Sequence, residues 1–565
     1  MTRGAVALLR RLEESRAQFD RSAETRKLAL LEALDGRSLA TSDQVLRLHE
    51  VLCFLRAYPD GPRLRARVVA MLATFERRPD LRRHRRALAD TGIAGTSIEY
   101  RFFWPTAHWL VRRWGRHLGI VWADLDQRDR LADLLPLLAA YGETPALDEI
   151  DYSPRQWLAR LKGPDETDAG FLVRRFAALH MDEFTREKIY DQLDPPLRIT
   201  PGAGTPSRTR AWCATGPTVF RRRPLDGGRP DLGAELRRPP RAVRAVSRRE
   251  GQQLIDLARA SMVTRSRDLD AFSWGDPDDV RLADCGDGLQ FAVIGTIPAR
   301  RLLLEAVYGF LTLMNGVPIG YVLNSALYGS AEIAYNVFET WRGGESGAIY
   351  GRALATVRHL FGCDSFTIYP YQLGDGNQEA IETGAWWFYR KLGFHPRDPD
   401  ALRVMAQETK RMQVRPTHRS SAATLRRLAR ANLFYHLGRP RDDVIGALPL
   451  PAVGLAVTRE LASRFGSDRE RAVRVCTDQA MRALGVRSRR GWSAGERLAW
   501  ERWAPLVLAL PGLTRWRAED RRALVQVVRA KGGRRESEFA WRFDRHRRLR
   551  EAVRRLAQEE DSANP

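Results

Sequence analysis

The sequence predicts an α+β fold, in which a mixed central sheet with flanking helices lies between mainly helical N- and C-terminal regions. Apolar residues recur at three- and four-residue steps through residues 1–196 and 398–565, which is the period of amphipathic helices. Between residues 241 and 397, strand-like apolar runs alternate with helical patterns. The segment 197–240 is rich in proline, glycine and arginine and is typical of a linker. These four segments are the predicted domain organisation.

The helical N-terminal region is clearest at 45–58 and 65–78, where the apolar stripe is continuous. A short basic amphipathic segment follows at 80–90. The aromatic-rich segment 101–114 is expected to pack the centre of this region. No fixed-period repeat supports a solenoid.

The central region supplies the strands. Strands are predicted at 241–247, 288–297, 308–314, 317–323, 332–338 and 365–373, and helices at 248–263, 345–361 and 377–392. The strongest local signal is the Asn315-Gly316 dipeptide between two apolar runs, because this pair favours a tight hairpin turn. Beyond residue 398 the helical pattern returns, and the arginine-rich segment 534–556 is interpreted as a solvated helix face.

The charge of the chain is strongly positive. Its 565 residues carry a formal net charge of +24, a field that attracts nucleic acid, anionic surfaces and polyanions such as coenzyme A. Nearly all the cations are arginine, with only six lysines, a bias that a GC-rich genome also produces. Nucleic acid is therefore a partner that the charge allows but does not favour.

The expected compartment is the cytoplasm. The five cysteines are widely spaced, so neither a zinc site nor a disulfide framework is expected. The first residues lack an apolar run before their charges, so no signal peptide is expected, and no apolar run is long enough for a membrane span. Searches for Walker-A, zincin and nucleophile-elbow motifs find none, and no metal site is predicted.

One glycine-rich loop lies between a predicted strand and a predicted helix. It is W341-R-G-G-E-S-G-A348, and its glycines would let backbone N–H groups turn toward a ligand. The start of the following helix adds unpaired donors and a partial positive charge, so the loop is a candidate pyrophosphate site to which Arg342 and Arg352 could add charge. The alternative is that Gly343-Gly344 only makes a tight turn into the helix.

The central region resembles the core of the GNAT superfamily of acyl-CoA-dependent N-acyltransferases. The resemblance is carried by the hairpin run GVPIGYVL, the strand IAYNVF, the loop RGGESGA and the ending NQEA…FYRKLGF. The family shows an R/Q-x-x-G-x-G/A loop, then an N-x-x-A helix that ends in Y-x-K-x-G-F. The residues that match these last two motifs are Asn377, Ala380, Tyr389, Lys391, Gly393 and Phe394. Two departures are present: Glu345 replaces the middle glycine of the loop, and residues 383–387 lengthen the last helix by about one turn.

The resemblance implies a site and a reaction. Acetyl-CoA or another acyl-CoA would be the co-substrate, and an amine of unknown identity would attack its thioester. Tyr389 would be the general acid for the thiolate and Glu332 a base. The residues implied in cofactor binding are Arg342, Gly343, Gly344, Gly347, Ala348 and Asn377. The alternatives for the two catalytic positions are a core aromatic at 389 and an exposed strand residue at 332.

Two functions therefore stay open from the sequence. One is an active N-acyltransferase whose helical regions shape a substrate site or a dimer. The other is a non-catalytic GNAT-like scaffold that binds nucleic acid or a protein partner. The loop departure and the charge favour the second, whereas the intact ending and the strand-loop-helix order favour the first.

Overall fold

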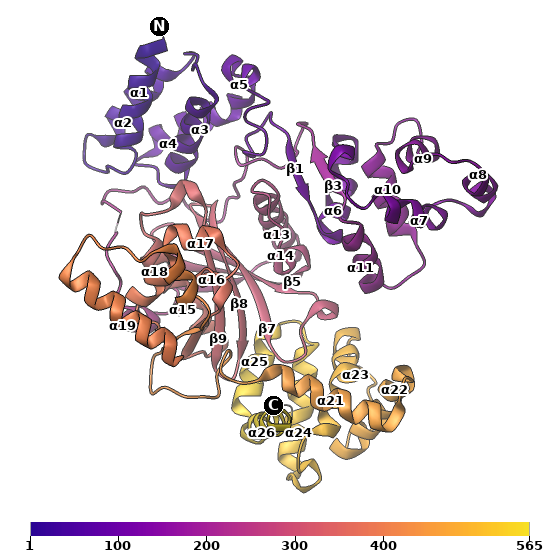
Figure 1. The fold of residues 1–565 in the computed structure, drawn as a ribbon. Helices are drawn as coiled ribbons and strands as arrows, with labels where there is room; N and C mark the ends of the chain where they lie inside the picture. The colour runs from indigo at the N-terminus through magenta and orange to yellow at the C-terminus, as the bar shows by residue number, and fades with distance from the viewer. Residues whose placement is uncertain (1, 226, 564–565) are drawn as a thin grey trace. The chain divides into compact units, whose positions relative to one another are not determined.

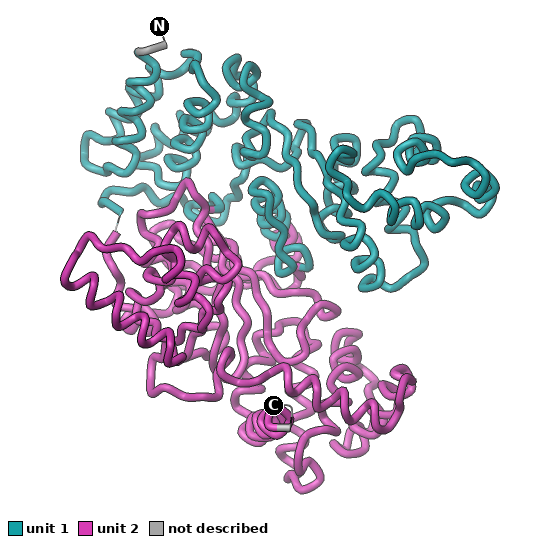
Figure 2. The backbone as a smooth tube through the Cα atoms, viewed as in Figure 1, with its two compact units in different colours: residues 1–225, 253–274, 314–318 teal, residues 226–252, 275–313, 319–565 magenta. Residues whose placement is uncertain are grey.

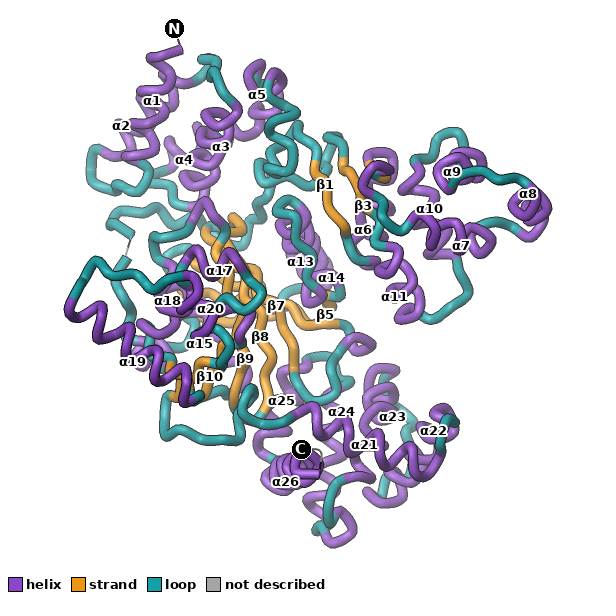
Figure 3. The backbone as a smooth tube through the Cα atoms, in the orientation of Figure 1, coloured by secondary structure: helices purple, strands orange, loops and turns teal. Residues whose placement is uncertain are grey.

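The computed structural model describes residues 2–225 and 227–563. The first residue, residue 226 of the predicted linker and the last two residues lie outside the described part of the chain. The described chain is a mixed α/β structure with a large mixed sheet and flanking helices (Figure 3). It forms two compact units (Figure 2): unit 1 holds 1–225, 253–274 and 314–318, and unit 2 holds 226–252, 275–313 and 319–565.

Unit 1 is mainly helical. Its helices are α1 (Thr2–Ser15), α2 (Ala23–Leu34), α3 (Ser42–Ala57), α4 (Pro62–Thr74), α5 (Pro79–Arg83), α6 (Trp104–Trp114), α7 (Arg128–Leu138), α8 (Thr144–Glu149), α9 (Pro154–Leu161), α10 (Asp168–Ala178), α11 (Glu183–Leu193) and α14 (Asp270–Ser273). The N-terminal region also contains a small antiparallel sheet that the helical prediction missed. Its strands are β1 (Ile98–Arg101), β2 (Leu118–Ile120) and β3 (Pro196–Ile199), in the order β1-β3-β2. They are three or four residues long in their pairings, too short for a period-2 pattern to be visible.

The aromatic segment 101–114 packs within an apolar cluster of unit 1 that residues 98–199 and Val263 form and that includes no described residue of α1 to α5. Phe102, Trp104 and Trp109 are buried in one apolar cluster with residues of α7, α10, α11 and β3. The indole of Trp109 donates to Asp256 of α13 (Arg248–Val263), a helix whose first residues belong to unit 2 and whose remainder belongs to unit 1.

Unit 2 is built on a nine-stranded sheet (Figure 1). Its strand order is β11-β12-β10-β9-β8-β7-β6-β5-β4. The strands are β4 (Ala242–Ala245), β5 (Gly275–Gly286), β6 (Leu289–Thr296), β7 (Ala306–Met314), β8 (Val317–Leu327), β9 (Ser330–Val337), β10 (Ser365–Ile368), β11 (His395–Pro396) and β12 (Leu433–His436). β9 and β10 are parallel, and the pairs β4–β5, β5–β6, β8–β9, β10–β12 and β11–β12 are antiparallel.

Most of the predicted strands are confirmed. The turn between β7 and β8 is the predicted one, since Asn315 and Gly316 have φ of 51° and 77°, the left-handed pair that a type I′ hairpin needs. β5 was not predicted, because the run GDPDDVRLADCG is rich in residues that are uncommon in strands. Pairing on both sides, with β4 and β6, holds it as a strand despite that composition.

Two predicted elements of this region are wrong in extent. The strand predicted at 365–373 ends at Ile368, because Pro370 starts the short helix α16 (Pro370–Leu373). The single helix predicted at 377–392 is two helices, α17 (Gln378–Thr383) and α18 (Ala385–Lys391). They meet at Gly384, whose φ of 65° ends the first helix.

The remaining helices of unit 2 flank the sheet. They are α12 (Leu232–Leu236), α15 (Ser346–Phe361), α19 (Pro399–Val414), α20 (Ala422–Leu428), α21 (Leu450–Phe465), α22 (Arg469–Leu484), α23 (Ala494–Ala509), α24 (Ala518–Lys531), α25 (Glu536–Arg545) and α26 (Arg547–Ala563). Short 3-10 helices of both units lie at Phe75–Arg77, Gly115–His117, Trp122–Asp124, Tyr141–Glu143, Pro298–Arg300, Glu339–Trp341 and Leu513–Arg515.

No helix in the described part of the chain combines the length and apolar character that a membrane crossing requires.

Helices α21 to α26 form a group beside one end of the sheet (Figure 1). Buried charges join this group to the strands. Lys531 pairs with Glu536 at 2.6 Å, and Arg301 donates to the carbonyls of Lys531 and Gly533 at 2.8 and 2.6 Å. The backbone N–H of Ser537 donates to the Tyr308 hydroxyl of β7 at 2.8 Å. The C-terminal helices therefore belong to the same compact unit as the sheet.

Candidate functional site

The parallel strands β9 and β10 pair over a short distance only. Their register covers Ser330–Ser365, Ala331–Phe366 and Glu332–Thr367. Beyond that point β9 continues to Val337 along β8, whereas the chain leaves β10 at Ile368 and turns into α16. The two strands therefore part after Glu332, and beyond this residue β10 does not pair with the outer edge of β9 in the described chain.

A cavity of about 210 Å³ lies at the far end of β9, where the strands have parted. Its wall combines the end of β9, the start of α15 and the helices α16 to α18. The lining residues are Tyr335, Asn336, Val337, Arg342, Ser346, Gln372, Asn377, Glu379, Ala380, Thr383, Ala385, Phe388 and Tyr389. The Asn336 Oδ1 is buried and has no hydrogen-bond partner among the described residues.

Aromatic rings form one wall of this cavity. Tyr389 of α18 is 3% exposed, and its ring lies 5.6 Å from that of Tyr350 and 5.9 Å from that of Phe394. Tyr335 stacks on Phe388 at 6.4 Å and donates its hydroxyl proton to the carbonyl of Ser346 at 3.0 Å. Burial, with a smaller effect of Tyr321, raises the pKa of Tyr389 well above its usual value. Its phenol is therefore a proton donor at neutral pH.

The glycine-rich loop leads into α15 next to this cavity. Gly343 has a φ of 86°, a left-handed conformation that favours glycine. Gly347 lies in the first turn of α15, where an added Cβ would be 3.1 Å from Pro230 Cδ and 3.7 Å from the Gly228 carbonyl oxygen. The segment 228–230 of the same unit thus packs against the start of α15. Glu345 precedes the helix without capping it through its side chain.

Two of the predicted ligand-binding side chains already have partners. The Arg342 Nε donates to the Val337 carbonyl at 3.0 Å, and its guanidinium pairs with Glu379 of α17. The Asn377 Oδ1 accepts from the Ala380 N–H at 3.2 Å and so caps α17. Both residues line the cavity while holding the loop and α17 in place.

Glu332 lies at the point where β9 and β10 part. Burial, and then the nearby Glu305, raises the pKa of the Glu332 carboxyl to about 7. Burial also raises the pKa of Tyr369 to about 12, with Glu332 and Glu305 as smaller causes. Glu332 is four residues before Asn336, which is about 13 Å along an extended strand. A carboxyl with a pKa near neutral is suited to proton transfer.

The structure thus brings some of the predicted site residues together and separates others. Tyr389, Arg342 and Asn377 line the cavity. Glu332, Gly343, Gly344, Gly347 and Ala348 are not among its lining residues. Four further lining residues were not among the predicted site residues: Tyr335, Asn336, Ser346 and Phe388. Tyr335 and Asn336 could have been found because they end the strand that precedes the loop.

The described residues contain no group of three or more histidine, cysteine, aspartate or glutamate side chains arranged to hold a metal ion. Comparison with known proteins adds no family assignment: no protein-family model, curated protein or solved structure shows significant similarity to this chain.

Proposed function

We propose that the cavity beside β9 binds an acyl-CoA and that the protein transfers its acyl group to an amine, as in the GNAT acyltransferases that the sequence resembles. The observation that carries the proposal is the parting of parallel β9 and β10 beside a cavity that opens at the start of α15. A pantetheine arm is a narrow chain with two amides. It could pair with the backbone groups at the edge of β9, as an added strand does.

The start of α15 is the proposed site for the pyrophosphate. Ser346 is its first residue and lines the cavity. Unpaired N–H groups and the positive end of the helix dipole favour an anion there. Arg342 lies at the same end of the cavity, and exchange of its Glu379 partner for a phosphate would cost little because the two side chains are 36% and 45% exposed.

The proposed reaction is direct transfer. The amine nitrogen attacks the thioester carbonyl, the C–N bond forms and the C–S bond breaks. The leaving thiolate takes the phenolic proton of Tyr389, which burial keeps on the oxygen. Glu332, whose pKa of about 7 leaves it partly ionised at neutral pH, receives the proton that the amine loses through intervening water, because it does not line the cavity that Tyr389 lines. An acyl-CoA anchored at α15 and extended back along β9 would span the roughly 13 Å from Asn336 toward Glu332.

Thermal unfolding with acetyl-CoA and longer acyl-CoAs tests the binding step. A ligand at a hundred times its dissociation constant should stabilise the protein by about 2.7 kcal/mol. Absence of a shift with every acyl-CoA tested would overturn the proposal.

Tyr389→Phe tests the chemical step. Release of free CoA in the presence of amino acids, polyamines and peptides should fall by about 10²-fold or more, because the variant lacks the acid. Acyl-CoA affinity should change little. Tyr371→Phe is the matched control, since Tyr371 is 60% exposed on α16 and does not line the cavity. Unchanged turnover in Tyr389→Phe would remove Tyr389 as the acid.

A second candidate is a non-catalytic scaffold that binds nucleic acid or a protein partner. Two contacts favour it: Pro230 packs on Gly347 at the start of α15, and Arg342 is paired with Glu379. Duplex DNA at low salt tests the nucleic-acid form, and an affinity that falls steeply with added salt would support it. Binding of DNA without any binding of acyl-CoA would favour the scaffold.

The cytoplasm is the proposed compartment. The five cysteines are free thiols, and Cys53, Cys285, Cys363 and Cys476 are buried. Unpaired cysteines suit a reducing environment.

A further inference from the structure

A second cavity lies at the opposite end of β9. The turn between β8 and β9 is made by Tyr328 and Gly329, whose φ values are 57° and 61°. The Tyr328 side chain is 1% exposed and its ring contacts that of Phe543 at 5.3 Å. Tyr328 precedes Tyr335 by seven residues, so this end of the strand is about 23 Å from the first cavity.

The second cavity has a volume of about 220 Å³ and is rich in arginine. It is lined by Tyr328, Asp443, Arg547, Arg550, Glu551 and Arg554. Arg547, Arg550 and Arg554 are spaced by three and four residues on α26, so they share one face of that helix. Arg547 is the first residue of α26, where the helix dipole adds a partial positive charge.

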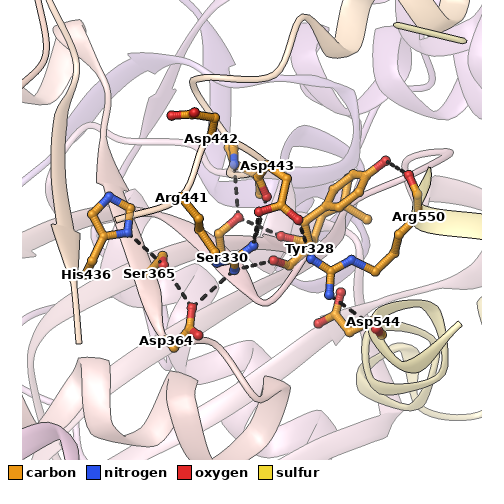
Figure 4. A network of polar contacts seen from close by, with 12 residues as sticks. Tyr328, Ser330, Asp364, Ser365, His436, Arg441, Asp442, Asp443, Asp544 and Arg550 are labelled. Atoms are coloured by element: carbon orange, nitrogen blue, oxygen red, sulfur yellow. Dashed lines mark hydrogen bonds and ion pairs between the residues drawn. The ribbon is translucent and has the colours of Figure 1, made fainter. Parts of the chain in front are cut away.

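The polar network behind the cavity fixes one of these arginines (Figure 4). Asp443 accepts from Arg550 at 2.5 Å and from Arg441 at 2.6 Å. Arg441 also donates to Asp364 at 3.1 Å and to the carbonyl of Tyr328. The charge of Asp443 is therefore shared by two guanidinium groups, and it does not neutralise the rest of the cavity.

The outer two arginines, unlike Arg550, are not held by a carboxylate of the described chain. Arg547 and Arg554 are exposed, and neither forms an ion pair or a side-chain hydrogen bond with another described residue. Their neighbours on the helix differ, because Arg548 pairs with Asp520 and Arg555 with Glu559. With Arg550 held by Asp443, two free guanidinium groups face one carboxylate, that of Glu551.

The Ser365–His436 pair beside this network is not a nucleophile and its base. His436 Nδ1 lies 2.9 Å from Ser365 Oγ, and its Nε2 lies 2.9 Å from a guanidinium nitrogen of Arg397. A guanidinium only donates, so Nε2 accepts and the ring proton sits on Nδ1, directed at the serine. Burial and Arg397 both lower the pKa of His436, which keeps the ring neutral. This pair therefore supplies no activated nucleophile at this end of β9.

We propose that this arginine-lined cavity binds a small phosphorylated anion, with Arg547 and Arg554 as its main ligands and Arg550 as a fixed third charge. Planar guanidinium groups match phosphate oxygens in paired hydrogen bonds. A volume of about 220 Å³ is below that of most pockets for drug-sized ligands, so it suits one or two phosphate groups. The buried ring of Tyr328 closes the floor of the cavity.

Calorimetric titration of the full chain with sodium pyrophosphate tests the site. The double variant Arg547→Gln/Arg554→Gln should bind about a hundredfold more weakly or worse, because two guanidinium groups lose their charge-assisted hydrogen bonds to the phosphate oxygens. Arg542→Gln/Arg555→Gln is the matched control. It removes the same charge from exposed positions of α25 and α26 that do not line the cavity, and its affinity should stay within about twofold of wild type.

Two further variants keep the outcome decisive. Glu551→Gln removes the opposing carboxylate and should tighten pyrophosphate binding by about threefold, which a misfolded protein could not do. Arg342→Gln distinguishes this cavity from the start of α15: pyrophosphate bound in this cavity is unaffected, whereas pyrophosphate bound beside Arg342 is lost. The proposal is overturned if wild type binds no pyrophosphate, if both double variants lose affinity equally, or if Arg342→Gln alone abolishes binding. It stands or falls independently of acyl-CoA binding.

Discussion

The two ends of β9 have different surroundings, since one end lies among aromatic rings and the other among charged side chains. At the end near Val337 the strand meets a cluster of aromatic rings around Tyr350, and the nearby cavity has a mainly apolar wall. At the end near Ser330 it meets charges: Arg441 and Arg550 hold Asp443, and the cavity there is lined by arginine. One strand thus ends at a cavity with an aromatic wall and, about seven residues away, at a cavity lined by arginine.

The difference between the ends is also a difference in how stability is achieved. Packed rings contribute through the burial of apolar area, a contribution that pH does not change and that charge screening does not weaken. Paired charges contribute through hydrogen bonds. Removal of one partner destabilises the protein, because it leaves the other charge buried without a hydrogen bond. Substitutions at the two ends should therefore change the free energy of unfolding by different amounts, and these changes should depend differently on salt and pH.

The largest effect is expected at the aromatic end. Tyr350 is fully buried, and its ring contacts those of Tyr335, Phe388, Tyr389 and Phe394 at 5.0 to 6.2 Å. Tyr350→Ala should lower the free energy of unfolding by about 3–5 kcal/mol, because it removes a large side chain from a packed cluster. Chemical denaturation monitored by circular dichroism measures the loss.

Tyr350→Phe separates packing from polarity. Within the described residues the Tyr350 hydroxyl is buried without a hydrogen-bond partner. Its removal should therefore be neutral or stabilise the protein by up to about 1 kcal/mol. A loss of more than about 1 kcal/mol in this variant would show that the hydroxyl has a partner and that this end is not purely apolar.

A smaller effect is expected at the charged end. Arg441 is 24% exposed and bonds to Asp443, Asp364 and the carbonyl of Tyr328. Arg441→Met should cost about 2–3 kcal/mol, since it leaves these acceptors without their shared donor. The loss should shrink at high salt, unlike that of Tyr350→Ala, because screening weakens charge pairs alone.

Arg439→Met is the control for this end. Arg439 is exposed two residues earlier on the same loop, and its replacement should change stability by less than about 0.5 kcal/mol. Equal losses in the two variants would mean that the loop, and not the network of Arg441, holds this end of β9.

The contrast between the two ends also marks the limit of the sequence analysis. The hairpin at Asn315-Gly316, the strand β9 and the helix α15 were predictable because their signals are local: turn residues, apolar alternation and a helical stripe. The break at Gly384 was not, since one glycine inside a helical pattern is usually tolerated. β5 was missed because long-range pairing and not composition makes it a strand.

The candidate site, like the fold, could be predicted only in part from the sequence. Spacing and resemblance selected Arg342, Asn377 and Tyr389, and these three line one cavity. The pairing of Arg342 with Glu379 and the packing of Pro230 on Gly347 could not be read from the sequence, because they depend on how distant segments fold back. The arginines of α26 were predicted to be a solvated face, and their alignment with Tyr328 depends on the C-terminal helices docking at the end of β9.

The smallest effect is expected at Glu332, which lies between the two ends of β9. Burial raises the pKa of this carboxyl to about 7 from an ordinary value near 4.5. Between these values the folded chain holds a proton that the unfolded chain has released. Stability from this group therefore falls as pH rises from about 4.5 to 7 and is constant above that range. Glu332→Gln cannot ionise, so it should match wild type near pH 4.5 and exceed it at pH 8.

The gain at pH 8 should be about 1–2 kcal/mol, less than the roughly 3 kcal/mol that the full shift implies, because Glu332 is partly exposed. Thermal unfolding of wild type and variant from pH 4.5 to 8.5 measures it. Glu339→Gln, at an exposed position after β9, should leave the pH dependence unchanged. A Glu332→Gln curve parallel to wild type across this range would mean that water reaches the carboxyl freely. The part of β9 between its two ends would then be solvated, and Glu332 would lose the raised pKa that suits it to accept a proton.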